Sequence, residues 1–177
     1  KFNNTYKFYE AGYKGVCIEP DPHIHALLAR KRPKDICLNI GIAGKASSAT
    51  DFYIMSNPAL NTFSKEEAEG LEESMHGKIR KVISVPLQTV EQVIDKHFSG
   101  KSPVFINLDV EGLDEEILNT FPFHKYRPAI FCIETVHYTD DASSAKRREI
   151  FDLMKAQDYK SFADTYLNNI FIDARKF

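Results

Sequence analysis

The chain has 177 residues, of which 43% are hydrophobic and 27% are charged, and its formal net charge is -2. A chain of this length can bury a core, and its balanced charge does not favour a nucleic-acid partner, which would need a basic surface. No apolar run reaches the roughly 18 residues of a membrane span, and no signal-peptide pattern opens the chain. We therefore expect a cytoplasmic protein without a membrane span, of undetermined oligomeric state. The three cysteines lack C-x-x-C spacing, which predicts small buried side chains in a reducing compartment.

Apolar runs alternate with segments of helical period along the first half of the chain. In chain order we predict a strand at 15–19, a helix at 22–32, and strands at 36–42 and 51–55. A polar helix at 64–76 opens with Ser64 and Glu67 in capping-box spacing, and its thin apolar stripe is typical of a surface element or lid. A strand at 80–86 ends at Pro86, and a helix opens at Thr89.

The second half contains two continuous apolar runs, 104–109 and 129–136, each predicted to be a buried strand. A helix carrying Ile117 and Leu118 separates them, another helix is expected at about 144–157, and 158–174 reads as a hairpin. Strands that are apolar throughout, alternating with helices, predict an α/β fold with a doubly wound, mostly parallel sheet. The terminal hairpin adds an antiparallel edge, and we expect one domain over residues 1–177.

Ligands of open α/β sheets bind beyond the carboxyl ends of the strands, so the residues at these ends are the candidate site. The first predicted strand ends in Glu19, whose carboxylate can accept hydrogen bonds from both hydroxyls of a ribose; a solvated acid before a helix is the alternative. Asn39, in the next strand, is suited to contact an adenine edge or to be a hydrogen-bonded core amide.

The segment INLDVEG brings two carboxylates to the end of a buried strand, Asp109 and Glu111, before Gly112. Such groups are costly to bury unless they bind a cation, a proton or a metal, although one of them could simply cap the following helix. The strand 129–136 presents Glu134 near its end, with His137 just beyond. A histidine beside carboxylates is a candidate general base, because its ordinary pKa lies near neutrality.

Three other polar features lie outside this group of candidate catalytic residues. The basic cluster Lys146-Arg147-Arg148 is predicted to be a solvated helix face. Asn169, at the start of the last predicted strand, is expected to belong to a turn, with an inward orientation as the alternative. The segment 56–78, which includes Asn61 and Thr62, is where we expect contacts with an acceptor substrate or a lid.

Five segments in order, GYKGVCIEPDP, CLNIGIAG, FINLDVEGLDEEIL, RPAIFCIET and NNIF, resemble the FkbM methyltransferase family over nearly the whole chain. The resemblance implies a class I, Rossmann-like methyltransferase fold whose last strand is antiparallel. It also implies S-adenosylmethionine as methyl donor and a hydroxyl acceptor on a sugar, a polysaccharide or a natural product. By matching motifs, Glu19 would bind the cofactor ribose, Asn39 would lie near adenine, and Asp109 would face the methionine half and the reacting centre.

Relatives of this kind begin with a strand and an acidic, glycine-containing loop that cradles the methionine part of the cofactor. The sequence opens instead at KFNNTYKFYEAG, which resembles the helix after that loop. Without the first strand, strand edges in mid-sheet would be exposed, so we expect the native protein to be longer at its N-terminus.

The sequence thus predicts an S-adenosylmethionine-dependent O-methyltransferase in which Asp109, Glu111, Glu134 and His137 surround the acceptor. Either His137 or Asp109 would take the proton of the hydroxyl, and if a divalent cation such as Mg²⁺ assists, the same carboxylates would be its ligands. Two alternatives are a methyltransferase-like binding module without turnover and a nicotinamide-dependent oxidoreductase, since an acid after the second strand of such a fold also suits NAD.

Overall fold

The computed structural model describes residues 4–110, 113–138 and 144–177. The chain divides into two compact units, Lys1–Thr89 and Val90–Phe177. The elements of the first unit are α1 (Tyr6–Glu10), β1 (Val16–Ile18), α2 (Pro22–Lys31), β2 (Ile36–Leu38), β3 (Gly41–Ile42), β4 (Ser47–Met55), the 3₁₀ helix η1 (Pro58–Leu60), α3 (Lys65–Glu73) and β5 (Ile79–Gln88). Those of the second are α4 (Val90–His97), β6 (Phe105–Leu108), α5 (Asp114–Thr120), β7 (Ile130–Glu134), β8 (Val136–Tyr138), β9 (Ser144–Lys146), α6 (Arg148–Ala156), β10 (Tyr159–Asp164) and β11 (Asn168–Asp173).

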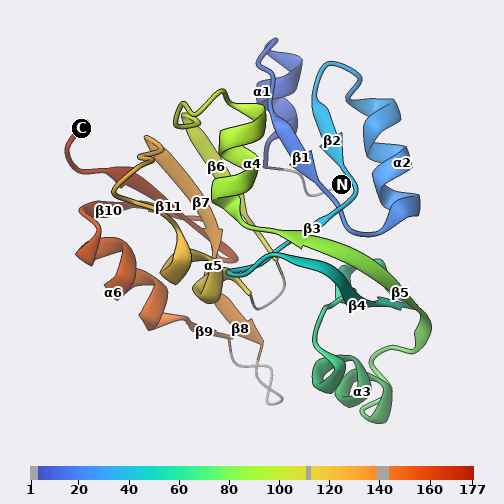
Figure 1. Cartoon of the computed structure of the whole chain (residues 1–177). Helices are drawn as coiled ribbons and strands as arrows, with labels where there is room; N and C mark the ends of the chain where they lie inside the picture. Colours follow the sequence, from blue (N-terminus) through green and yellow to red (C-terminus); the bar gives the residue numbers. More distant parts are fainter. Residues whose placement is uncertain (1–3, 111–112, 139–143) are drawn as a thin grey trace. The chain divides into compact units, whose positions relative to one another are not determined.

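The described strands form four sheets of mixed direction (Figure 1). β1 and β2 are parallel, β3 and β5 are parallel with β4 antiparallel to β5, and β8 pairs with β9 antiparallel. The largest sheet has the order β10-β11-β7-β6, in which only β6 and β7 are parallel. The α/β class is therefore confirmed, whereas the single, mostly parallel sheet is confirmed only in part.

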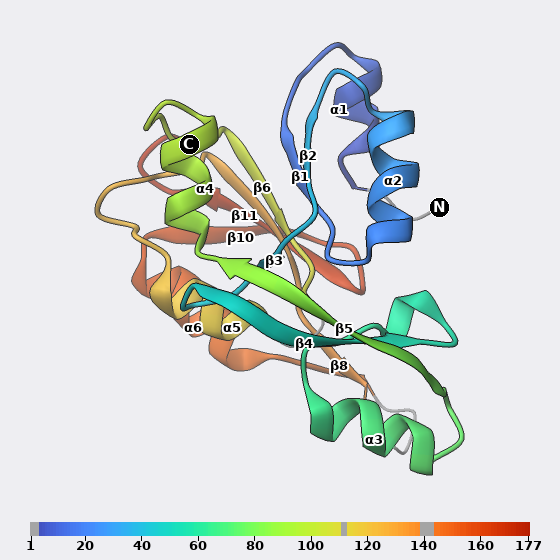
Figure 2. The same cartoon turned by 45° about the vertical axis from the view of Figure 1, so that its right-hand side comes forward.

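The hairpin of β4 and β5 is longer than the sequence predicts, and α3 packs beneath it (Figure 2). β4 begins at Ser47, and its first half is polar and partly exposed. The apolar pattern that predicts a strand at 51–55 does not include this half. β5 continues through Pro86 to Gln88, although the sequence analysis ends the strand at Pro86. The register of β4 against β5 shifts between Ser47 and Thr50, next to Pro86, so the missing N–H disturbs few ladder bonds.

The predicted strand at 36–42 is in fact two strands, because β2 stops at Leu38 and β3 starts at Gly41. β2 pairs with β1, where Cys17 lies opposite Cys37, whereas β3 pairs with β5. The change of partner places Asn39 just after β2. All three cysteines are free, but only Cys132 is buried, so the expectation of buried side chains is confirmed only for Cys132. Cys17 and Cys37 are half-buried, and burial raises the pKa of the Cys17 thiol to about 12.

In the second unit, α5 and α6 cover one face of the four-stranded sheet (Figures 1 and 2). The side chains of β7 alternate, so that Phe131 and Ile133 belong to this buried core while Cys132 and Glu134 lie on the opposite face. Phe131 packs edge-on against Tyr159 of β10, with ring centroids 5.2 Å apart. The core therefore fixes which residues of β7 reach the candidate site.

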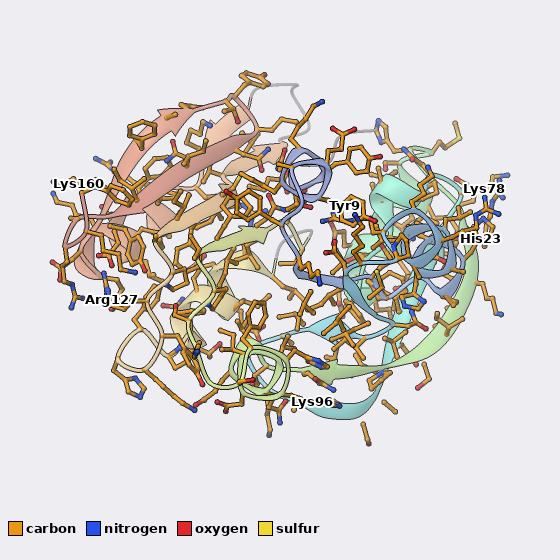
Figure 3. All side chains as sticks on the ribbon, turned by 90° about the horizontal axis from the view of Figure 1, so that it is seen from above. Tyr9, His23, Lys78, Lys96, Arg127 and Lys160 are labelled. Carbon is orange, nitrogen blue, oxygen red and sulfur yellow. The ribbon has the colours of Figure 1, made fainter. Side chains whose placement is uncertain are left out.

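The terminal hairpin is confirmed, since β10 and β11 are antiparallel within 158–174. Asn169 lies inside β11 and is 1% exposed, so the turn role is wrong and the inward alternative is confirmed. The guanidinium of Arg127 makes two hydrogen bonds to the carboxylate of Asp173 and joins the end of this hairpin to the segment before β7. Figure 3 shows Arg127 beside the hairpin that carries Lys160.

Candidate active site

Glu19 follows β1 directly, and its side chain is half-buried. Its backbone N–H donates to Leu38 O at 3.0 Å, which continues the β1–β2 ladder by one bond. Its Oε1 accepts a hydrogen bond from the Asp21 N–H at 2.9 Å. Burial raises the pKa of this carboxyl above its ordinary value, whereas the hydrogen bond from Asp21 lowers it. In the described part of the chain Oε2 accepts no hydrogen bond, so it can accept from a ligand.

Asn39 stabilises the turn that carries Glu19. Its Nδ2 donates to Glu19 O and to Pro20 O, both at 2.9 Å, and the residue is exposed. Because an amide nitrogen has two hydrogens, both donors are used, and Asn39 can offer a ligand only its acceptor, Oδ1. Asp21 adds a second constraint on this turn, since its Oδ1 caps α2 by accepting from the N–H groups of His23 and Ile24.

Two polar residues of the segment 56–78 are buried and bonded within the protein. Asn61 is buried, accepts from Met55 N at 2.8 Å and donates to Asp21 Oδ2 at 3.3 Å. Thr62 is also buried and donates to Glu67 Oε2 at 2.6 Å. Both side chains are therefore engaged in holding the start of α2 and of α3, which leaves them unsuited to the acceptor contacts expected there.

In the second unit, Asp109 and Glu134 come from the carboxyl ends of the parallel strands β6 and β7. Leu108 is the Cα partner of Ile133, so the next residues, Asp109 and Glu134, are neighbours at the end of the pair. Glu134 is half-buried and Asp109 is exposed. The sequence prediction that both carboxylates meet at one sheet edge agrees with this register.

Glu134 has an unusual electrostatic environment. Burial and the nearby negative charges of Asp109 and Asp114 raise its pKa to about 7, while Arg147 acts in the opposite direction. Partial loss of hydration also raises the pKa of Asp109 above its ordinary value. Glu134 therefore exchanges its proton near neutral pH, where a general acid or base is most effective.

Asn168 is the antiparallel partner of Glu134 at the start of β11, so the two side chains lie on one face of the sheet. Its Oδ1 is buried and has no hydrogen-bond donor in the described part of the chain. A buried acceptor without a donor is costly. Asp109, Glu134 and Asn168 together gather acceptor oxygens that a donor, such as a hydroxyl group, would satisfy.

A buried ion pair lies close enough to Glu134 to affect its pKa. Arg147 Nη1 and Asp114 Oδ2 are 3.3 Å apart, and the two side chains are 8% and 0% exposed. The interpretation of Lys146-Arg147-Arg148 as a solvated helix face is therefore wrong for Arg147. It is also wrong for Lys146, which lies in β9 and whose Nζ donates to Thr135 Oγ1 and Asp164 Oδ1. Residues 144–146 form a strand, so the helix expected at about 144–157 begins only at Arg148.

Two predicted site residues cannot be placed. Glu111 lies outside the described residues. The backbone of His137 belongs to β8, three residues after Glu134, but its side chain is outside the described part. Among the residues that the structure describes, no group of three or more His, Cys, Asp or Glu side chains could hold a metal ion. The expectation of a Mg²⁺ site therefore has no support from these residues.

The helices of the described ranges are too short or too polar to cross a membrane. Among curated proteins and among solved structures, neither comparison found a match. The sequence model of the methyltransferase FkbM domain matches residues 1–161, which include Glu19, Asn39, Asp109 and Glu134. The match thus covers most of the 177 residues and both candidate groups of side chains. This chain belongs to the FkbM methyltransferase family.

Proposed function

We propose that the chain is an S-adenosylmethionine-dependent O-methyltransferase that acts on a hydroxyl group of a sugar, a polysaccharide or another natural product. The observation that carries this proposal is the group of acceptor oxygens at the ends of β6, β7 and β11. Asp109, Glu134 and Asn168 supply acceptors, and Asn168 Oδ1 lacks a donor among the described residues. Such a group suits a substrate that brings an O–H and must lose its proton. The nicotinamide alternative gains no support from the family.

The residues after β1 and β2 fit the nucleoside part of the cofactor. Glu19 keeps Oε2 for ribose hydroxyls, and the Asp21 N–H fixes the orientation of the carboxylate through Oε1. Asn39 would accept from the exocyclic amino group of adenine with Oδ1, because its Nδ2 is bonded to the backbone. Bound S-adenosylmethionine supplies a methyl group on a positively charged sulfur.

On this proposal, Glu134 would receive the proton of the acceptor hydroxyl as the carbon–oxygen bond to the methyl group forms and the carbon–sulfur bond breaks, leaving a neutral thioether. Its pKa of about 7 makes it a better proton acceptor at neutral pH than an ordinary carboxylate. Asp109 accepts a hydrogen bond from the same hydroxyl and orients it, and its negative charge raises the proton affinity of Glu134. Little else is required of the protein, because alignment dominates the barrier of an in-line displacement.

Calorimetric titration of the whole chain with S-adenosylmethionine tests the cofactor half of the proposal. Glu19→Gln should weaken binding by about tenfold or more, since hydrogen bonds to a charged group contribute roughly 1.5–3 kcal/mol. Glu73→Gln, an exposed change of the same kind on α3, should leave the affinity unchanged. No binding by the wild-type protein would refute the assignment.

The transfer half is tested by incubating the protein with S-adenosylmethionine labelled in its methyl group and a panel of saccharides. We expect label in the product with wild type and a loss of at least about 100-fold with Glu134→Gln, which is the usual contribution of a general base. Tight cofactor binding without transfer to any acceptor would instead indicate a binding module without turnover.

A further inference from the structure

The ion pair between Asp114 and Arg147 connects the backbone that follows the two catalytic candidates. Asp114 Oδ1 accepts from the Val110 N–H at 3.4 Å, directly after Asp109. Arg147 donates its backbone N–H to Thr135 O at 2.9 Å, directly after Glu134. Because Arg147 also holds Asp114 Oδ2 through Nη1, these bonds form a path from the end of β6 to the end of β7.

We propose that the Asp114–Arg147 pair is the positioning element of the site, which sets the separation of Asp109 and Glu134. This inference rests on the proposed function for the meaning of that separation. Neither residue needs to touch the substrate. Asp114 begins α5 and Arg147 precedes α6, so the pair also fixes both helices against the ends of the two strands.

The burial of the pair is what distinguishes it from an ordinary surface contact. Arg147 Nε is buried without a hydrogen-bond acceptor in the described residues, and burial raises the pKa of Asp114. Burying two charges at this cost is a poor way to gain stability alone, since apolar side chains of similar size stabilise a core as well or better. Holding reacting groups in place is a reason to retain the pair, because a displacement of about 1 Å can cost roughly 100-fold in rate.

The charged groups that act on Glu134 come from three segments around it. They are Asp109 after β6, Asp114 on α5 and Arg147 before α6. Removing the charge of Asp114 takes away one of the two negative charges that raise the proton affinity of Glu134. The pH at which Glu134 titrates therefore reports whether Asp114 lies close to Glu134, and the comparison of kcat with KM reports whether the pair positions the site.

The test compares Asp114→Asn with Glu115→Gln, which removes an exposed charge from the same turn of α5. With the saccharide that wild type methylates fastest, we expect kcat of Asp114→Asn to fall by about tenfold or more, because misplacement by less than 1 Å already slows transfer. The KM for S-adenosylmethionine should stay within about twofold of wild type, because the variant changes the placement of Asp109 and Glu134 and not the affinity for the cofactor. Glu115→Gln should match wild type in both constants.

Carboxyl NMR of the whole chain gives a readout that needs no activity. Glu134 should titrate at a lower pH in Asp114→Asn than in wild type and at the wild-type pH in Glu115→Gln. Equal Glu134 titration in the two variants, or an unchanged kcat, would overturn the proposal. If wild type neither binds S-adenosylmethionine nor transfers label, the proposed function fails, and the NMR titration still tests separately whether Asp114 lies close to Glu134.

A double variant guards against loss of the fold. Asp114→Leu with Arg147→Met leaves no unpaired buried charge, so the protein should remain folded by circular dichroism. The double variant removes both the acceptor of the Val110 N–H and the bond between residues 114 and 147, so kcat should fall as in Asp114→Asn. A folded double variant with the wild-type kcat would show that the pair does not position the site.

Discussion

Asp173 offers the most direct test of how the second unit is held together. Its side chain is 1% exposed and accepts two hydrogen bonds from Arg127, at 2.7 Å from Nη2 to Oδ1 and at 3.2 Å from Nε to Oδ2. Arg127 also donates to Gln157 O and lies over the ring of Tyr159. Asp173→Asn keeps the shape of the side chain and removes its charge.

Removing one member of a buried ion pair costs about 3–5 kcal/mol. Arg127 is 18% exposed and keeps its contacts with Gln157 and Tyr159, so the lower end, about 3 kcal/mol, is the expected loss. For a chain of this size that loss lowers the melting temperature by roughly 6–12 °C. The carboxyl pKa of Asp173 is lowered by the hydrogen bonds from Arg127, and the lost stability must therefore depend on pH.

The sign of this dependence follows from the lowered pKa. Folding lowers the pKa of the Asp173 carboxyl below its ordinary value of about 3.9. The stabilisation by Arg127 is therefore complete above that pH and disappears as the pH falls through the pKa of the folded state. Thermal unfolding followed by circular dichroism should show a difference between wild type and Asp173→Asn at pH 7 that shrinks below about pH 4.

The matched control is Asp158→Asn, which removes a carboxylate paired with Arg175 at the surface, where both side chains are more than half exposed. Such a pair contributes at most about 1 kcal/mol, so this variant should unfold close to wild type. Equal melting temperatures for Asp173→Asn and Asp158→Asn at pH 7, or a difference from wild type that does not shrink as the pH falls below about 4, would refute the reasoning.

Three further predictions concern the site, a helix cap and the core. Above pH 7 the charge on Glu134 opposes folding, because the pKa of this carboxyl is raised to about 7 in the folded protein. In urea unfolding, Glu134→Gln should therefore stabilise the protein by about 1–2 kcal/mol at pH 8.5 and have little effect at pH 4.5. Asp21→Ala removes the cap of α2 and should cost about 1–2 kcal/mol in the same assay, and no loss would contradict the capping role. Phe171→Ala empties a site that is 1% exposed and should cost about 3–5 kcal/mol, whereas Phe162→Ala, at a position 69% exposed, should cost less than about 0.5 kcal/mol.

The elements that depend on local pattern were predictable from the sequence. The helix at 22–32 and the terminal hairpin are both present, because apolar spacing and turn residues act over a few positions. The break between β2 and β3 and the polar start of β4 were not predictable, since each depends on which strand lies alongside. Strand partners are set by contacts that are distant in the sequence, which periodicity does not report.

The same distinction between local pattern and distant contacts applies to the candidate site. Asp109 and Glu134 could be identified because each ends an apolar run, and parallel pairing brings such ends together. Asp114 and Arg147 could not, since an acid in the first turn of a helix is ordinary and a basic triplet is usually solvated. Only the folded chain shows that the two are buried against each other.

The position of β11 in its sheet has a practical consequence for protein production. β11 lies between β7 and β10, yet the family match ends at residue 161, within β10 and before β11 begins. A protein cut after residue 161 would lose the strand that joins β10 to the rest of the sheet, and β7 would become an open edge prone to association with other chains. The segment that sequence comparison recognises is thus shorter than the segment that must be expressed for the second unit to fold.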